Sequence, residues 1–202
     1  MKDNPVIIIF QKNLVEGKVK TRLAKSIGNV KALQVYQYLL NHTHQQVALL
    51  ETPTLVFFEN TVEGDFLHQP YFSGAVQIGE DLGERMKNAF QQAFDMGYQQ
   101  VIIIGTDCLQ LDSHILEESL NALDSHEMVI GPAKDGGYYL LGLRQMYATL
   151  FEDKKWSSPT VFSDTMKAAK KLGLNPWVLK ELSDIDTYMD LGEEEKTIFH
   201  IE

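Results

Sequence analysis

Residues 101–107 read VIIIGTD, four β-branched apolar residues followed by a glycine, a threonine and a carboxylate. A run this short and this apolar is typical of a strand that is buried on both faces, as in a parallel sheet. Three similar runs occur elsewhere in the chain, at residues 6–10, 54–58 and 128–130. Together the four runs predict the core of a parallel sheet.

Helical spacing separates these runs. In the first intervening segment a mostly apolar stripe recurs every three or four residues, at Leu33, Tyr36, Leu40, Thr43, Val47 and Leu50. Residues 83–97 repeat the pattern and end at Gly97, which suits a helix C-cap. A third helix is expected to start with Ser158 as N-cap and Pro159 in its first turn, and to stop at Gly173. Strands that alternate with helices indicate an α/β fold.

Two further strands are expected, at residues 138–143 and 177–180. The first follows its predecessor too closely for a helical crossover, which favours an antiparallel or mixed addition to the sheet. We therefore predict a three-layer α/β sandwich around a mixed, mostly parallel central sheet. No linker or repeat marks a boundary, so residues 1–202 are expected to form a single domain. In open sheets of this kind, ligands bind at the carboxyl ends of the strands.

The chain carries 18 basic and 28 acidic residues, a net charge of −10, which argues against a nucleic-acid-binding surface. Five of the cations and a single acid, Glu16, fall within residues 12–25, which therefore carry a net charge of +4. The other 188 residues carry −14. A short cationic segment on an acidic protein suits a small anionic ligand.

The single cysteine, Cys108, excludes an intramolecular disulfide. The first apolar run has five residues, whereas a signal peptide needs roughly 7–15. No stretch approaches the roughly 20 apolar residues that span a bilayer. We expect a cytoplasmic protein without membrane insertion.

The cationic segment follows the first predicted strand and reads EGKVKTRLA at residues 16–24. Gly17 would let the backbone approach a ligand, while Lys18, Lys20 and Arg22 offer ammonium and guanidinium donors to phosphate oxygens. The glycine spacing is not that of a P-loop. The alternative is a solvated, positively charged turn.

Carboxylates follow the predicted strands. Asp107 ends the VIIIGTD stretch, where it can bind a hard cation such as Mg²⁺ together with a nucleotide phosphate, or cap the next helix. Asp184 and Asp186 alternate about Ile185 and would face the same way if the preceding strand continued. Either could ligate a metal or cap the last helix.

Two glycine-containing segments are also candidates. In GPAKDGGYY, residues 131–139, the pair Gly136 and Gly137 follows Asp135, which fits either backbone pressed against a ligand or a plain hairpin turn. In QIGEDLGERM, residues 77–86, glycines bracket Asp81 and open a helix. Backbone N–H groups there could meet a base or a phosphate, or the segment could be an ordinary loop before a helix.

Six motifs in order resemble one known family: VKTRL, DLGxRM, IGTD, GPxxDGGY, WS and DIDT. The chain is similar to the radical-SAM/selenodomain-associated transferases of type 1. That family is related to the nucleotide-diphospho-sugar transferases of the glycosyltransferase A (GT-A) fold, and to the guanylyltransferases of phospholactate and molybdenum-cofactor synthesis. The resemblance extends from residue 7 to about residue 191.

The resemblance implies a nucleotide over the loop after the first strand, at Gln11, Lys12, Gly17, Lys18, Lys20 and Arg22. The segment QIGEDLGERM adds three residues to the predicted nucleotide-binding set: Gln77, Asp81 and Gly83. The resemblance also implies a divalent cation, Mg²⁺ or Mn²⁺, on Asp107, with Asp135 and Asp186 as candidate partners.

The expected activity is metal-dependent transfer from a nucleotide or nucleotide-sugar donor to an unidentified small-molecule acceptor. Lys20 and Arg22 would neutralise charge on the diphosphate, and Asp135 would act on the acceptor side. The residues predicted to contact substrate are Gly136, Gly137 and Tyr138. The family label favours glycosyl transfer. Guanylyltransferase-like nucleotidyl transfer is the alternative, and a non-catalytic nucleotide-binding module is the second alternative.

Overall fold

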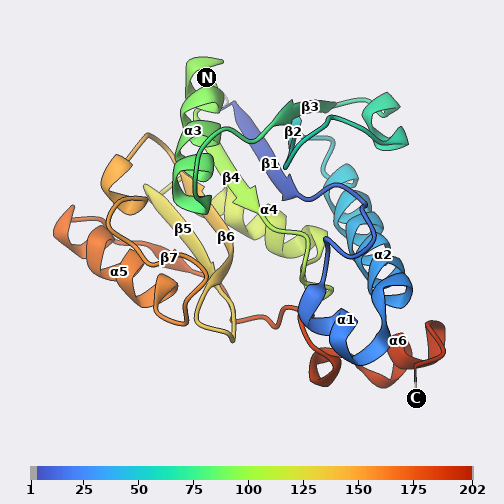
Figure 1. Ribbon diagram of the computed structural model, residues 1–202. Helices are drawn as coiled ribbons and strands as arrows, with labels where there is room; N and C mark the ends of the chain where they lie inside the picture. The colour runs from blue at the N-terminus through green and yellow to red at the C-terminus, as the bar shows by residue number, and fades with distance from the viewer. Residues whose placement is uncertain (1–3, 202) are drawn as a thin grey trace.

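The computed structural model describes residues 4–201 and contains a seven-stranded sheet in the order β3-β2-β1-β4-β6-β5-β7 (Figure 1). The strands are β1 (Pro5–Gln11), β2 (Thr54–Phe58), β3 (Phe72–Val76), β4 (Gln100–Ile104), β5 (Met128–Pro132), β6 (Tyr138–Leu143) and β7 (Trp177–Val178). Neighbouring strands are parallel except where β6 pairs with β4 and β5. The predicted α/β fold with a mixed, mostly parallel sheet is confirmed.

Helices cover both faces of this sheet. The α-helices are α1 (Thr21–Ile27), α2 (Asn29–Ala48), α3 (Leu82–Asp95), α4 (Ser113–Ala122), α5 (Val161–Lys171) and α6 (Glu193–Ile198). The short 3-10 turns are η1 (Asp65–His68), η2 (Ala148–Leu150) and η3 (Tyr188–Asp190). No helix within residues 4–201 has the length and apolar character needed to cross a membrane.

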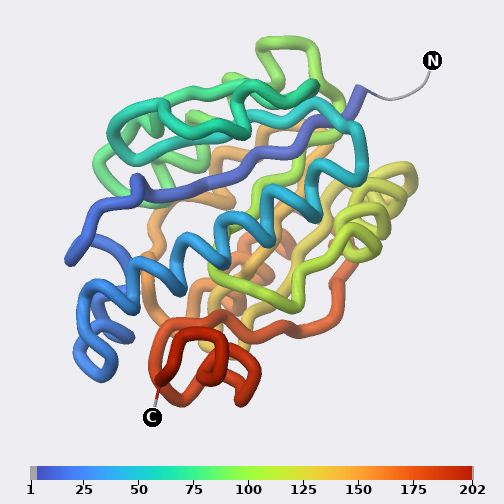
Figure 2. The backbone as a smooth tube through the Cα atoms, turned by 90° about the vertical axis from the view of Figure 1, so that its right-hand side faces the viewer, coloured from blue at the N-terminus to red at the C-terminus, as the bar shows by residue number. Residues whose placement is uncertain are grey.

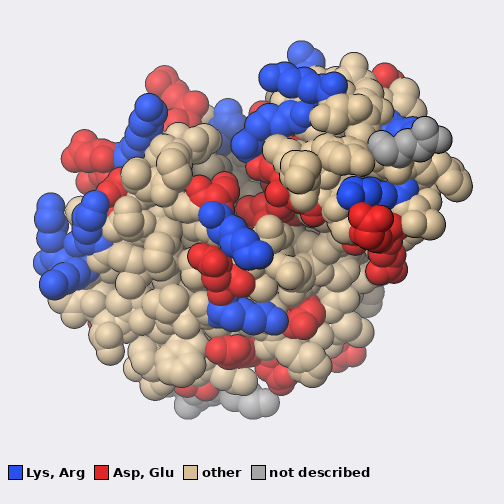
Figure 3. Space-filling view, turned by 90° about the horizontal axis from the view of Figure 1, so that it is seen from below, with Lys and Arg blue, Asp and Glu red and all other residues tan. Residues whose placement is uncertain are grey.

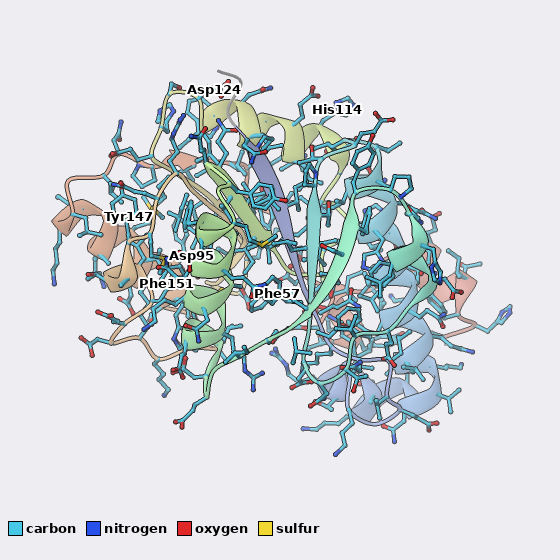
Figure 4. The ribbon with its side chains drawn as sticks, turned by 90° about the horizontal axis from the view of Figure 1, so that it is seen from above. Phe57, Asp95, His114, Asp124, Tyr147 and Phe151 are labelled. Carbon is cyan, nitrogen blue, oxygen red and sulfur yellow. The ribbon has the colours of Figure 1, made fainter. Side chains whose placement is uncertain are left out.

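Alternation along the strands divides the core between the two faces. Ile8 and Phe57 belong to the cluster that contains Phe90 of α3, and α5 adds to the same face. Ile7, one position from Ile8, belongs to the opposite cluster with Leu116 of α4 and with part of α2. Figure 2 shows α2 and α4 together over this second face, and Figure 4 shows the layers from above. The sheet is therefore the middle of three layers.

Two predicted element boundaries were wrong. Helix α5 begins at Val161 with Thr160 as N-cap, rather than after Ser158. The Ser158 hydroxyl instead contacts the Thr160 hydroxyl, and the carbonyl of Gly136 accepts the N–H of Phe162 at 2.9 Å. The last strand, β7, has only two residues, because its parallel pairing with β5 does not extend to residue 180.

The edge strand β3 and helix α1 lie outside the elements predicted from the sequence, while α4 and α6 were expected only as helices after Asp107 and near the C-terminus, without bounds. Strand β3 reads FSGAV and has no fully buried residue, so it lacks the continuous apolar run that marks the inner strands. Its Gly74 lies directly under Val62, whose Cγ1 would be 2.3 Å from a Cβ at that position. The strand is held by its parallel pairing with β2, and Gly74 leaves room for the Val62 side chain.

The C-terminal segment returns to the amino-terminal helices (Figure 1). Ile185, Leu191 and Ile201 form a cluster with Leu23 of α1 and with residues of α2. The N–H of Ile185 donates to the carbonyl of Asp107 at 2.8 Å. This contact brings the SDIDT segment to the carboxyl end of β4.

Candidate active site

A cavity with two adjoining lobes, of about 550 and 400 Å³, opens at the carboxyl ends of β1 and β4. Residues that line both lobes include Arg22, Asp107, Tyr138, Asp184 and Asp186. The first lobe also reaches Lys12 and Lys20, and the second lobe reaches Asp135 and Gly137. Figure 3, seen from below, shows acidic and basic side chains gathered around a hollow on this side of the molecule. The cavity lies where open α/β sheets bind ligands.

An ion-pair network crosses the cavity. The Lys20 Nζ lies 2.6 Å from Oδ1 of Asp107 and 3.2 Å from Oδ1 of Asp186. Arg22 binds the other oxygen of Asp186, with 2.6 Å between Nη2 and Oδ2. The Lys20 side chain is 4% exposed, whereas that of Arg22 is 66% exposed. Lys20 is therefore an internal cation, and Arg22 is a rim cation.

Neither Asp107 nor Asp186 caps a helix. Helix α4 is capped by Asp112, whose carboxylate accepts the N–H of Ile115, and α6 has Gly192 at its N-cap. The Asp186 side chain also lies outside any strand, since the backbone is irregular around it. Both carboxylates thus face the cavity and Lys20, and the helix-cap alternative is excluded for them.

The loop after β1 is anchored by Asn13 and Tyr36. The Asn13 amide nitrogen donates to the carbonyl of Thr61 at 2.7 Å and to Glu63 at 2.6 Å, while its oxygen accepts from the N–H groups of Asn60 and Thr61. The Tyr36 hydroxyl accepts the Lys12 N–H at 2.8 Å. Burial raises the pKa of Tyr36, so the phenol stays protonated at neutral pH. These bonds anchor the start of the loop, at Lys12 and Asn13, to α2 and to the segment after β2.

Gln11 and Gln77 line the first lobe and also hold the sheet together. The Gln77 amide donates to the carbonyls of Gln11 and Phe57, at 3.1 and 3.0 Å. The Gln11 side-chain oxygen lies 2.8 Å from Nε2 of His44. Burial lowers the pKa of His44 to about 4, so the imidazole is neutral and donates to Gln11. The two glutamine side chains therefore already form hydrogen bonds within the protein.

Four residues of the predicted nucleotide-binding set do not line either lobe: Gly17, Lys18, Asp81 and Gly83. Gly17 has φ +75° and turns the loop, and Lys18 is exposed. Asp81 is the N-cap of α3, and its carboxylate accepts the N–H of Glu84 at 2.8 Å. Gly83 lies against Trp156, whose Nε1 would be 2.2 Å from a Cβ at position 83.

The DGG segment is a hairpin turn at the edge of the second lobe. The N–H of Gly136 donates to the carbonyl of Ala133, and the N–H of Gly137 donates to the Asp135 carboxylate at 2.8 Å. Gly136 has φ +89°, and a Cβ there would lie 2.0 Å from the carbonyl oxygen of Pro159. The turn accounts for Gly136, while Asp135, Gly137 and Tyr138 still line the lobe.

Asp184, which the sequence offered only as a possible metal ligand or helix cap, and Trp156 are among the lining residues outside the predicted nucleotide, substrate and metal sets. Burial, and next the charge of Asp107, raise the pKa of Asp184 to about 7. The pairing of Lys20 with Asp186 could not be read from spacing, because the two residues are 166 positions apart. Cys108 also lines the first lobe, but burial raises its thiol pKa to about 11, which keeps it protonated and unreactive.

The family resemblance implies a divalent cation, for which carboxylate oxygens are the suitable ligands. Within residues 4–201, no group of three or more His, Cys, Asp or Glu side chains is close enough to hold a metal, so Asp107, Asp135 and Asp186 are not assembled as a triad. Mg²⁺ usually takes one or two carboxylates and completes its shell with water and substrate phosphates. Asp107 and Asp186, which both contact Lys20, fit that mode of binding.

Comparison with known proteins gives concordant results. A guanylyltransferase of 2-phospho-L-lactate from Methanocaldococcus vulcanius is 24% identical over 181 residues, which cover 87% of this chain and 78% of that protein. A crystal structure from Desulfovibrio desulfuricans G20, provisionally named a nucleotide-diphospho-sugar transferase, is 34% identical with a TM-score of 0.85 and covers 92% of this chain and 83% of its own. The synthase of 4-diphosphocytidyl-2C-methyl-D-erythritol from Anaerococcus prevotii, at 10% identity, shares the fold with a TM-score of 0.65 over 93% and 94% of the two chains.

The family model for DUF2064, described as uncharacterized protein conserved in bacteria, matches residues 41–158. That match covers more than half of the chain and includes β2 to β6. The 34% identity to the Desulfovibrio structure extends the likeness to nearly the whole length. The chain belongs to the DUF2064 family, within the nucleotide-diphospho-sugar transferase superfamily.

Proposed function

We propose that this protein is a metal-dependent nucleotidyltransferase that transfers a nucleoside monophosphate from a nucleoside triphosphate to a small acceptor. The observation that carries the proposal is the buried ammonium of Lys20 between Asp107, which follows β4, and Asp186 of the C-terminal segment. Such a constellation suits a polyphosphate with its counter-ion. The guanylyltransferase relative supports nucleotidyl rather than glycosyl transfer.

In the proposed reaction an acceptor oxygen attacks the α-phosphorus. The bond from that phosphorus to the bridging oxygen breaks, and pyrophosphate leaves with the electron pair. Lys20 and Arg22 neutralise the charge that develops on pyrophosphate. Asp135, which lines only the second lobe, accepts the proton of the acceptor. This arrangement assigns the triphosphate to the first lobe and the acceptor to the second.

Mg²⁺ or Mn²⁺ would be held by Asp107 and Asp186, and would supply charge neutralisation on the phosphates when bound. The protein's own part is to present the two carboxylates on adjacent segments, which the hydrogen bond from Ile185 to Asp107 holds together. Arg22 orients Asp186 through its second oxygen. In this proposal Lys20, Arg22 and the two carboxylates position the phosphates, without a set of three or more protein ligands around the metal.

Glycosyl transfer is the second candidate, because the Desulfovibrio relative is provisionally named a nucleotide-diphospho-sugar transferase. In that case the C1–O bond of a sugar breaks and a nucleoside diphosphate leaves. The six ordered motifs further favour membership of the radical-SAM/selenodomain-associated type 1 group within the superfamily. The residues assigned above would serve the diphosphate in the same way.

The test separates the two reactions by their leaving groups. The protein is incubated with Mn²⁺, a pool of small acceptors that includes 2-phospho-L-lactate, and either GTP, CTP, GDP-mannose or UDP-glucose. Acceptor-dependent release of pyrophosphate from a triphosphate supports the proposal, and release of a nucleoside diphosphate from a sugar nucleotide supports the second candidate. Thermal shifts with each nucleotide, with and without Mn²⁺, test binding alone, since a ligand at 100 times its Kd stabilises by about 2.7 kcal/mol. Absence of any shift rejects both.

A further inference from the structure

Lys20 occupies the space between the two carboxylates to which a metal is assigned. Its ammonium contacts the Oδ1 atoms of both Asp107 and Asp186, at 2.6 and 3.2 Å. A hard divalent cation that bridges the two carboxylates through these Oδ1 atoms would lie roughly 2.0–2.1 Å from each of them. Two cations that contact one pair of oxygens repel each other, and the repulsion is strengthened by the burial of the Lys20 side chain. Lys20 in this position and a metal that bridges the two Oδ1 atoms are therefore mutually exclusive.

The backbone at Lys20 points to the same conclusion. Lys20 is the N-cap of α1 and has φ 45° and ψ 43°, a left-handed conformation that is unfavourable for a residue with a side chain. A strained residue persists only where its surroundings hold it, and such residues concentrate at functional sites. Here the conformation accompanies a side chain that is 4% exposed and ends between two carboxylates. Loss of those contacts would release the side chain.

Arg22 provides the contrast. It contacts only Oδ2 of Asp186, so Asp186 keeps a partner on that oxygen when Lys20 leaves Oδ1. The backbone bond from Ile185 to the carbonyl of Asp107 keeps the two acidic segments adjacent. The site can thus exchange one cation for another without losing its framework.

We propose that Lys20 is a resident counter-cation that keeps a divalent metal from bridging Asp107 and Asp186 until a nucleotide binds, and that it is displaced when the nucleotide supplies phosphate oxygens for its ammonium. The proposal rests on the proposed function, since it assigns the phosphates to the first lobe. Metal and nucleotide then bind as coupled ligands, and each raises the affinity for the other by the same factor. The nucleotide-free protein binds metal weakly despite its two available carboxylates.

The experiment measures Mn²⁺ alone, by electron paramagnetic resonance of the free ion, on the wild type and on the variants Lys20→Met and Arg22→Met. Each variant removes one positive charge next to Asp186, but only Lys20→Met vacates the shared oxygens. We expect Lys20→Met to bind Mn²⁺ at least 10-fold more tightly than the wild type, and Arg22→Met to change the affinity less than 3-fold. Equal gains in both variants, or none in Lys20→Met, overturn the proposal.

A second measurement uses the unaltered protein. Pyrophosphate, corrected for its own complex with Mn²⁺, should raise the affinity of the wild type for Mn²⁺ by 10-fold or more, and should have a much smaller effect in a folded Lys20→Gln variant. No effect in the wild type overturns the coupling. Binding of GTP in metal-free buffer is measured separately, so that failure of nucleotide binding, which would reject the proposed function, is not confused with failure of the displacement. Thermal melting confirms that each variant is folded.

Discussion

Two loops of this protein carry the same outward signs of a phosphate site, and the fold uses them differently. The loop after β1 combines Gly17 with cations, and the segment before α3 combines Gly83 with Asp81. In the first, Lys20 points into the cavity and is nearly fully buried. In the second, Asp81 caps α3 and Gly83 makes room for Trp156. A glycine beside a polar residue indicates that some group packs closely against the backbone. That group can be a ligand or, as at Gly83, a side chain of the same protein.

The largest expected effect falls on the first loop. The double change Lys20→Glu and Arg22→Glu should weaken nucleotide binding by several kcal/mol, because a hydrogen bond to a charged group contributes about 1.5–3 kcal/mol. Isothermal titration with GTP or the best nucleotide from the thermal screen measures the change. The reversal of Lys18 and Lys25 serves as control, since it alters net charge equally at exposed positions. If the two double variants lose the same affinity, the cavity network has no special role.

His44, which is hydrogen-bonded to Gln11 at the end of β1, should make the stability of the protein depend on pH. The pKa of His44 in the folded protein, about 4, lies below its ordinary value of 6.5. The contribution of the neutral imidazole to the free energy of unfolding is therefore fully present above pH 6.5 and is lost as pH falls toward 4. The loss amounts to at most roughly 3 kcal/mol of unfolding free energy. Urea unfolding at pH 7 and pH 4.5 should show a smaller difference in His44→Gln, which can still donate to Gln11.

The control for this measurement is His114→Gln, on the outer side of α4 (Figure 4). This variant also removes a histidine, but His114 is exposed whereas His44 is buried. We expect its pH dependence to match that of the wild type. If His44→Gln also matches the wild type, the burial of a neutral imidazole under the β1 loop does not govern acid stability.

Gly83→Ala tests the second loop. A Cβ at this position would meet the Trp156 ring at 2.2–2.5 Å, so the indole must shift, at a cost of about 1–3 kcal/mol. Nucleotide affinity of the folded variant should stay unchanged. In a Trp156→Ala background the same substitution should be neutral or stabilising, because alanine favours the helix by about 1 kcal/mol over glycine. Urea unfolding of the four proteins measures the coupling, and equal costs in both backgrounds would contradict the packing explanation.

The two loops also mark the limit of what the sequence predicts. The inner strands could be predicted because runs such as residues 101–104 are apolar on both faces, and their ends then place Asp107 at the ligand edge. The use of Asp81 could not, because a carboxylate before a helix suits a phosphate-binding loop and an N-cap alike. Nor could the contact of Lys20 with Asp186, which depends on the C-terminal segment packing against α1. The local sequence pattern predicts the strands and helices. Whether a polar residue caps a helix, forms an ion pair or binds a ligand depends on contacts between distant parts of the chain.

Asp81→Ala has the smallest expected effect and separates the two uses most directly. Asp81 and Asp112 cap α3 and α4 in nearly the same geometry, with φ and ψ of −125° and 173° against −120° and 172°. Their carboxylates accept backbone N–H groups at 2.8 and 2.9 Å. Loss of such a cap costs about 1 kcal/mol. Asp112→Ala is therefore a matched control for the cap alone.

If Asp81 is only a cap, both variants should lose about 1 kcal/mol in urea unfolding and should bind nucleotide like the wild type. If Asp81 also contacts the nucleotide, the two variants should lose the same stability while Asp81→Ala alone loses affinity in the titration. The difference in affinity between the variants thus isolates the ligand contribution from the helix contribution. A measurable difference would return the segment before α3 to the nucleotide site and would show that Asp81 changes partners when the nucleotide binds.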